Sequence, residues 1–389
     1  MYLVGIDISK YKHNCFIATE TGEIIKDAFS FQNNSIGFQT LRELLSFLDK
    51  PNEIRIGLEA TGHYGKNLKR FLNDNGYSFM EFNPYLVKRF ATSLTLRKTK
   101  TDKADAKLLS LILNSVTYQS YPLQSYHMND LKSLSRYHKK LIHKHSKELV
   151  SLTIILDQIF PEFKPFFGNK FTQTALFILN NYKTPERIMS INIKSFEKIR
   201  KISQYSFNTV KFVKLKTLAK NTVGYTSKSL ELKLDMILDS VNHLSDQINV
   251  LESYLTKQIK LINPPTLSIR GIGPLSALSI ITEYGDINNF SSPKQMLSYA
   301  GLDPSIIQSG MIDKTGKLVK RGSSFLRETL MNSASTFAIH NPVIYEYYMK
   351  KKAEGKAHRV VLTHIAKKLI RIIHHLEKNN IAFDSSKLR

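Results

Sequence analysis

Two apolar runs near the start of the chain each end on a carboxylate, and this feature most restricts the fold. The first run ends at Asp7 and begins at Tyr2, and the second extends from Ile54 to Leu58 and is followed by Glu59. Short apolar runs bounded by polar residues predict buried strands. A carboxylate at the end of a buried strand is costly unless it is paired or binds a cation. Two such residues therefore indicate a site rather than a solvated surface.

A second pair of acids lies at the start of a helical pattern. Asp102 and Asp105 are three residues apart within the predicted helix 101–114, for which Thr101 is a plausible cap. Carboxylates at two strand ends and on one helix face can converge on one point. Hard cations such as Mg²⁺ take oxygen ligands, and two metals about 4 Å apart can bind both the attacking and the leaving oxygen of a phosphoryl transfer. We therefore predict that the four acids bind Mg²⁺ or Mn²⁺.

The order of predicted elements favours an α/β fold for residues 1–125. Strands and helices follow one another as β-β-β-α-β-α-β-α-α, which is close to the ribonuclease H plan. On that plan the first and fourth strands are neighbours, so Asp7 and Glu59 would be adjacent. The strands are predicted at 2–8, 13–20, 23–31, 53–60 and 77–82, and the helices at 36–48, 63–75, from Pro84 onward, and at 101–114.

The composition indicates a polyanionic partner. The 389 residues are enough for two or three domains, and 56 Lys plus Arg against 32 Asp plus Glu give a formal net charge of +24. Such an excess favours binding to nucleic acid or to an acidic membrane surface. The sequence contains no apolar run long enough to span a membrane, its start does not resemble a signal peptide, and its one cysteine excludes an intrachain disulfide and a multi-cysteine zinc site. A cytoplasmic protein that acts on nucleic acid fits these observations.

Residues 126–263 are predicted to form a helical, coiled-coil arm. A basic helical pattern extends from about 128 to 160, and no packing can be assigned from the sequence for residues 166–226. A heptad pattern follows, which predicts an antiparallel helix pair or a dimerisation element. A helix packed within its own bundle and an intermolecular coil remain open alternatives. The basic residues are Lys132, Arg136, Lys139, Lys140, Lys144 and Lys147, and the heptad residues are Leu234, Ile237, Val241, Leu244, Ile248, Leu251 and Leu255.

A mostly helical third domain is predicted over residues 264–389, after the Pro264-Pro265 pair. Gly271-Ile272-Gly273 lies between two apolar helical patterns and resembles a helix-hairpin-helix, in which backbone N–H groups meet a phosphate. A polar loop around Ser309 and a basic turn over 317–322 follow, and helices are predicted at 323–339, 342–352 and 358–378. Contacts to nucleic acid are predicted for Gly271, Gly273, Lys317, Lys320, Arg321 and Arg327.

Motifs at both ends of the chain resemble those of the DEDD transposases of bacterial insertion sequences, the IS110 family. The resemblance implies a RuvC-like domain that binds a divalent metal through the four acids, and a C-terminal transposase domain whose nucleophile is Ser309. It also implies a phosphoserine link to DNA and a non-coding bridge RNA that pairs with target and donor DNA. Residues 160–225 look longer than is usual for the family. The matching segments are GIDISK, LEATGHY, LRKTKTDKADAKLL, residues 269–305, the QSG loop and KLVKRGSSFLRETL.

These observations predict a metal-dependent DNA recombinase that moves an insertion sequence. A homo-oligomer, either a dimer or a tetramer, is expected because strand exchange joins two DNA duplexes. One alternative is a structure-selective nuclease of the Holliday-junction resolvase type, which would use water as nucleophile and leave Ser309 as a turn residue. Another is a non-catalytic nucleic-acid-binding or assembly protein, against which the four intact acids argue.

Overall fold

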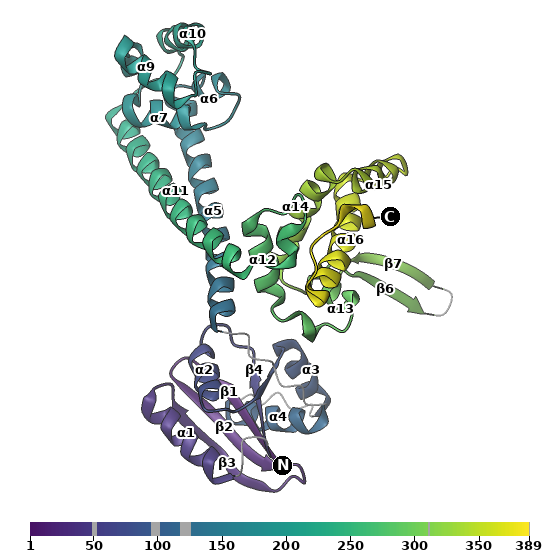
Figure 1. Cartoon of the computed structure of the whole chain (residues 1–389). Coiled ribbons are helices and arrows are strands. Elements are labelled where there is room, and N and C mark those ends of the chain that lie inside the picture. The colour runs from purple at the N-terminus through teal and green to yellow at the C-terminus, as the bar shows by residue number, and fades with distance from the viewer. Residues whose placement is uncertain (49–52, 95–101, 117–125, 310–311, 389) are drawn as a thin grey trace. The chain divides into compact units, whose positions relative to one another are not determined.

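The computed structural model describes residues 1–48, 53–94, 102–116, 126–309 and 312–388, with only the backbone described for 94, 126–127, 305–309 and 312–317 (Figure 1). The chain divides into two compact units. Unit 1 covers Met1–Leu123, and unit 2 covers Gln124–Arg389. The predicted boundary at 263/264 lies inside unit 2 and stays a prediction. Among the described residues, no helix is long and apolar enough to cross a membrane.

Unit 1 contains a five-stranded mixed sheet in the order β3-β2-β1-β4-β5. The pairs β1–β2 and β2–β3 are antiparallel, whereas β1–β4 and β4–β5 are parallel. The predicted adjacency of the first and fourth strands is thereby confirmed. The strands are β1 (Tyr2–Ile8), β2 (Lys12–Thr19), β3 (Ile24–Gln32), β4 (Ile54–Glu59) and β5 (Phe79–Phe82).

Helices cover both faces of this sheet. Side chains alternate between the two faces of a strand, so each face has apolar residues to bury. One face buries Val4, Ile6 and Ile8 against two helices, α1 (Ser35–Leu48) and α2 (Lys66–Asp74). The opposite face buries Leu3, together with Phe16 on β2, against α4 (Asp102–Ser115), with α3 (Pro84–Leu94) beside it. The first unit therefore has three layers, and its α/β class agrees with the prediction from the sequence.

Unit 2 contains a long antiparallel pair, α5 (Tyr126–Ile159) and α11 (Lys228–Ile262). His138 Nε2 lies 2.9 Å from Glu252 Oε1, and His145 Nε2 lies 3.1 Å from Ser245 Oγ, so the two helices run in opposite directions. The predicted seam on α11 faces α5 of the same chain. Its residues Leu234, Val241 and Leu255 are buried, while Leu244, Ile248 and Leu251 are only half-buried. Coiled-coil geometry and pairing between chains stay predictions.

A small helical head joins these two long helices (Figure 1). It has its own core, in which Phe160, Phe163 and Ile178 are fully buried with Leu234 of α11. The sequence predicted no packing for this segment, since its helices are short and their apolar residues follow no long period. The helices are α6 (Phe163–Phe166), α7 (Gln173–Tyr182), α8 (Pro185–Met189), α9 (Ile193–Ile202) and α10 (Thr209–Lys220).

The last 126 residues are mostly helical, as predicted, and share one core with the adjoining ends of α5 and α11 through Leu131, Leu255 and Ile259. One difference from the prediction is a two-stranded antiparallel hairpin of β6 (Pro304–Ser309) and β7 (Ile312–Leu318), where the sequence suggested a loop. The α-helices are α12 (Pro274–Tyr284), α13 (Pro293–Tyr299), α14 (Ser324–His340), α15 (Pro342–Ala353) and α16 (His358–Asn379). The 3₁₀ turns are Pro265–Ser268, Ile287–Asn289 and Ser385–Lys387.

Candidate functional site

The two strand-end acids lie on one edge and one face of the sheet. The parallel register pairs Ile6 of β1 with Leu58 of β4, and Asp7 and Glu59 each follow directly. Because Ile6 and Leu58 are buried on the face covered by α1 and α2, the next residue on each strand points to the other face. Both acids are partly buried. Asp7 and Glu59 therefore share the α4 side of the sheet at the carboxyl ends of neighbouring strands.

Helix α4 lies directly on β1, and its direction brings the other two acids toward the same edge. A Cβ added to Gly5 would lie 2.1 Å from the carbonyl oxygen of Ala106 and 2.7 Å from the amide nitrogen of Ser110. Ser110 Oγ donates to the carbonyl oxygen of Leu3 at 3.2 Å. Residue 110 is thus beside Leu3 and residue 106 beside Gly5, so the helix start extends toward Asp7.

The first turn of α4 contains both remaining acids. Asp105 is partly buried and Asp102 is exposed at the helix start. Carboxylates are favourable there because the N-terminal end of a helix carries partial positive charge. The backbone therefore assembles the four predicted acids from β1, β4 and α4 around one edge. Thr101, the predicted cap, lies outside the described residues.

The chemistry of the four predicted acids suits a hard divalent cation, since carboxylates supply only oxygen ligands. The described residues nevertheless contain no group of three or more His, Cys, Asp or Glu side chains close enough to hold a metal ion. Carboxylates repel one another in the absence of a cation. A shared ligand shell for Asp7, Glu59, Asp102 and Asp105 thus stays a prediction, which the backbone arrangement supports.

Ser309 is the last residue of β6 and pairs across the hairpin with Ile312. The sequence had suggested that this serine lies in a polar loop, and the structure places its backbone at a strand end instead. The neighbours Gly310 and Met311, and the side chains of Ser309 and Lys317, lie outside the described part of the chain. The β-branched residues Ile306, Ile307 and Ile312 were the missed strand signal, which the polar and glycine content of the segment obscured.

The base of this hairpin is fixed by one arginine and two glycines. Arg327 Nη1 of α14 donates to the carbonyl oxygen of Ala300 at 3.2 Å and lies 3.5 Å from that of Lys320. A Cβ at Gly322 would lie 1.9 Å from the carbonyl oxygen of Tyr299, and one at Gly301 would lie 2.7 Å from Arg327 Nη1. Arg327 thus holds backbone in place, and its predicted contact with nucleic acid stays a prediction.

The predicted phosphate-binding residues differ in their surroundings. Lys320 and Arg321 are exposed just after β7. Gly271 has a φ of +93°, and a Cβ there would lie 2.7 Å from the carbonyl oxygen of Thr336, so this glycine is needed for close packing on α14. Gly273 is exposed at the start of α12, and a Cβ there would meet nothing within 4 Å. The helix before this turn is only the 3₁₀ turn 265–268.

A buried carboxylate that the sequence analysis missed joins the arm to the C-terminal helices. Glu283, at 2% exposure, accepts hydrogen bonds from Arg136 Nη2 at 2.8 Å and Ser323 Oγ at 2.9 Å, and Arg136 Nε also donates to it. Lys132 Nζ lies 4.0 Å from the same carboxylate. Burial favours a raised pKa for Glu283, but the Arg136 hydrogen bonds and the nearby positive charges outweigh burial, and the pKa is lowered.

The basic face of α5 is therefore divided into two parts. Lys132 and Arg136 bind Glu283, and Lys139 donates to the carbonyl oxygen of Phe325 at 2.8 Å, so these residues fasten the arm to the C-terminal helices. Burial lowers the pKa of Lys132 and of Lys139. Lys140, Lys144 and Lys147 are exposed, and their contact with nucleic acid stays a prediction. An acid at the end of an otherwise apolar helix, as in α12, was the available signal for Glu283.

Comparison with known proteins gives two family matches. Residues 4–161 match a family model described as a transposase, the DEDD type of IS110. Residues 266–349 match a model described as a transposase of the IS116/IS110/IS902 family. Together the two matches cover more than half of the chain and contain all of the predicted site residues. Residues 162–265 lie outside both matched ranges.

Several relatives are similar over nearly the whole length. The pilin gene-inverting protein of Moraxella bovis is 25% identical over 391 residues, which cover 98% of this chain and 97% of that protein. The pilin gene-inverting protein of Moraxella lacunata is 24% identical over 393 residues, with the same coverage. An uncharacterized 43.6 kDa protein of insertion element IS110 from Streptomyces coelicolor is 20% identical over 396 residues, 98% of this chain and 95% of that protein.

Proposed function

This chain belongs to the IS110 family of transposases, and we propose that it cuts and rejoins DNA at a metal-dependent site formed by Asp7, Glu59, Asp102 and Asp105. The observation that carries this proposal is the packing of α4 on Gly5 of β1, which brings acids from three elements to one edge of the sheet. Membership in the family makes DNA the substrate. The number of acids and their all-oxygen chemistry suit Mg²⁺ or Mn²⁺.

A divalent cation at this edge would polarise the scissile phosphate and stabilise the charge that develops on it. The protein's own contribution is positional. Asp7 and Glu59 are fixed by the paired strands β1 and β4, whereas Asp102 and Asp105 are fixed by the contact of α4 with β1. Two acids on a sheet and two on a helix can approach one phosphate from different sides.

Ser309 is proposed as the nucleophile that joins protein to DNA. Its Oγ loses a proton and forms a bond to phosphorus, while the bond between phosphorus and a deoxyribose oxygen breaks and that oxygen leaves as a hydroxyl. A serine hydroxyl is a weak nucleophile at its own pKa and needs activation by a metal or a neighbouring acid. The phosphoserine ester conserves the energy of the cut bond, so the reverse attack by a DNA hydroxyl reseals the strand. Resemblance to the family and the position of Ser309 at the end of β6 support this role.

Basic residues near the hairpin are proposed to hold the nucleic acid backbone. Lys317, Lys320 and Arg321 follow the serine in sequence and can neutralise phosphates, while Gly273 offers its exposed turn at the start of α12. Such contacts are blind to sequence, so the choice of DNA site is proposed to come from base pairing with a bridge RNA. The protein is proposed to act as a homo-oligomer, since recombination requires several cuts in two duplexes.

The proposal is tested by replacing each of Asp7, Glu59, Asp102 and Asp105 with Asn or Gln and measuring cleavage of element-end DNA over a range of Mn²⁺ concentrations. Each variant should lose at least a hundredfold in rate and bind Mn²⁺ more weakly by calorimetry. The matched control is Asp27→Asn, on the exposed edge strand β3, which should cleave like the wild type. Full activity of an Asp7 or Asp105 variant, or of the wild type in excess chelator, would overturn the metal-site proposal.

A further inference from the structure

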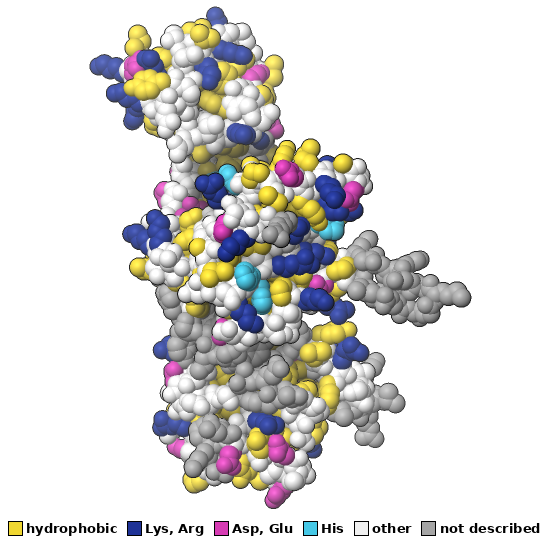
Figure 2. Space-filling model, turned by 45° about the vertical axis from the view of Figure 1, so that its right-hand side comes forward, with side chains coloured by type: hydrophobic (Ala, Val, Ile, Leu, Met, Phe, Trp, Pro, Cys, Tyr) yellow, Lys and Arg dark blue, Asp and Glu magenta, His cyan; other side chains and the backbone are white. Residues whose placement is uncertain are grey.

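The head of the arm carries a concentrated positive charge with no assigned role. Residues 162–226 contain ten lysines and two arginines against three glutamates and no aspartate. Two of the glutamates are engaged inside the head, since Glu162 accepts from Thr222 Oγ1 at 2.6 Å and Glu197 pairs with Arg200 at 3.2 Å. Figure 2 shows Lys and Arg side chains beside hydrophobic ones over this head, at the top of the view. The segment lies outside both family matches.

The charge is concentrated on two neighbouring helices. Seven lysines lie on α9 and α10, and within the described part of the chain none of the seven forms an ion pair. Exposed hydrophobic side chains accompany them: Ile193 is 78% exposed, Val210 is 74% exposed and Val213 is 58% exposed. A surface with this mixture favours a partner that is both polyanionic and partly apolar. The seven lysines are Lys194, Lys198, Lys201, Lys211, Lys214, Lys216 and Lys220.

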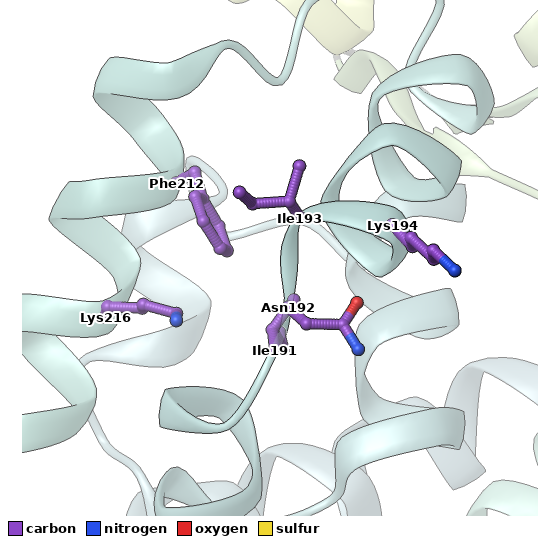
Figure 3. Close-up of a pocket in the computed structure, with 6 residues that line it drawn as sticks. All are labelled: Ile191, Asn192, Ile193, Lys194, Phe212 and Lys216. Atoms are coloured by element: carbon purple, nitrogen blue, oxygen red, sulfur yellow. The ribbon is translucent and has the colours of Figure 1, made fainter.

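An open slot lies between these two helices (Figure 3). Its volume is about 620 Å³, and it is lined by Ile191, Asn192, Ile193, Lys194, Phe212 and Lys216. Phe212 and Lys216 extend from α10 toward the space in front of Ile193, while Lys194 lies on the far rim. The lining therefore combines an aromatic ring, two aliphatic side chains and two ammonium groups, and contains no carboxylate.

The aromatic ring is held in place from behind. Phe212 stacks on Phe196 with ring centroids 4.6 Å apart and an angle of 25° between the planes. Lys216 Nζ lies over the Phe212 ring, 4.9 Å from its centroid. A cation–π contact at an exposed site is worth only about 0.5–1 kcal/mol, so the ammonium can move aside when a planar ring competes for that face. The displaced ammonium of Lys216 would then lie beside an anionic group attached to the ring of the ligand.

We infer that this slot receives an unpaired nucleotide of a single-stranded nucleic acid, with its base stacked on Phe212 and its flanking phosphates at Lys194 and Lys216. A base in a duplex has both faces covered, whereas a looped or single-stranded base exposes a face to an aromatic side chain. The inference deepens the proposed function and rests on it for the class of partner. The unpaired strand is either RNA or DNA, which offer the same base and phosphate chemistry.

The absence of tryptophan from the sequence provides a site-specific probe, because Phe212→Trp creates the only tryptophan of the chain. The full-length variant is titrated with an RNA hairpin that has a twelve-uridine loop, with the DNA hairpin of the same sequence, and with a blunt duplex of equal charge. Stacking should quench the tryptophan emission with one or both hairpins and not with the duplex. The hairpin that quenches at lower concentration identifies the sugar that is preferred.

Two further variants separate the slot from the general charge. Lys194→Ala/Lys216→Ala in the Phe212→Trp background should weaken the quenching by roughly tenfold, and Phe212→Leu should weaken hairpin binding by a similar factor measured by anisotropy. The control Lys201→Ala/Lys220→Ala, which removes the same charge from α9 and α10 outside the slot lining, should change the quenching at most twofold. Circular dichroism verifies folding.

Three results would overturn the inference: no quenching by either hairpin, equal quenching by the duplex, or equal quenching by polyglutamate, which would assign the slot to an acidic peptide. The measurement requires binding alone and no DNA cleavage. A negative binding result would therefore not refute the proposed catalytic site. Unchanged cleavage in an acid variant would refute the metal-site proposal and not the slot.

Discussion

Gly5→Ala is expected to separate α4 from β1 and thereby disable the four-acid edge. The new Cβ would lie 2.1 Å from the backbone oxygen of Ala106, whereas real side chains essentially never approach closer than 3.0 Å. The obstacle is helix backbone, which no rotamer change can move. Helix α4 must therefore retreat by about 1 Å, and such overpacking costs about 1–3 kcal/mol of folding free energy.

The retreat moves Asp102 and Asp105 relative to Asp7 and Glu59. A misplacement of about 1 Å can cost roughly a hundredfold in rate when reacting groups must be held in a fixed geometry. For a unit of this size, the lost stability should also lower the melting temperature by roughly 4–12 °C. The assay combines thermal denaturation, read by circular dichroism, with DNA cleavage in Mn²⁺ at a temperature well below both transitions.

Gly65→Ala is the matched control in the same unit. There the new Cβ would lie 2.9 Å from Ile8 Cδ1 and 3.3 Å from Lys69 Cε, which are far ends of flexible side chains. This variant should keep cleavage within about threefold and lose less than about 1 kcal/mol, since side chains can rotate away. The reasoning would be refuted if Gly5→Ala cleaved DNA like the wild type, or if both variants lost activity equally.

Two predictions concern the buried carboxylate. Glu283→Ala leaves Lys132 and Arg136 without their carboxylate partner and should lower the free energy of unfolding of unit 2 by about 3 kcal/mol, measured by urea unfolding. This value is at the low end for a broken buried ion pair because the Arg136 side chain is 41% exposed. A loss below about 1 kcal/mol would contradict the prediction. Because the folded-state pKa of Glu283 is lowered from 4.5, its contribution is present above pH 4.5 and is lost as the pH falls through the lower folded value. Stability of the wild type should thus fall more steeply than that of Glu283→Gln between about pH 5 and pH 3, and parallel curves would exclude the effect.

The sequence predicted unit 1 well because its signals are local. The strand predicted at 2–8 is observed as Tyr2–Ile8, and the helix predicted at 101–114 is observed as Asp102–Ser115. The adjacency of the first and fourth strands followed from the ribonuclease H plan, which the order of predicted elements favours. The side of the sheet occupied by Asp7 and Glu59 follows from the two-residue period of strands. What the sequence could not provide is the contact at Gly5, which depends on how closely α4 approaches.

In unit 2 the sequence could not show the long-range contacts of its basic residues. A row of basic residues on α5 suggests a nucleic-acid surface, yet three of them bind Glu283 or the carbonyl oxygen of Phe325, more than 140 residues away. Arg327 similarly binds backbone at the hairpin base. Charge alone cannot distinguish a solvated cation from one whose partner lies on a distant helix.

The central claim, cleavage and rejoining through a phosphoserine, is tested most directly by mapping a covalent adduct. Protein, RNA, Mn²⁺ and element DNA are incubated and denatured, and the DNA-linked peptide is identified by mass spectrometry. The account predicts a nucleotide on Ser309, its loss together with recombination in Ser309→Ala, and its retention in Ser305→Ala, four residues earlier on β6. Recombination by Ser309→Ala, or cut DNA with free ends and no attached protein, would contradict the account and favour a nuclease that uses water.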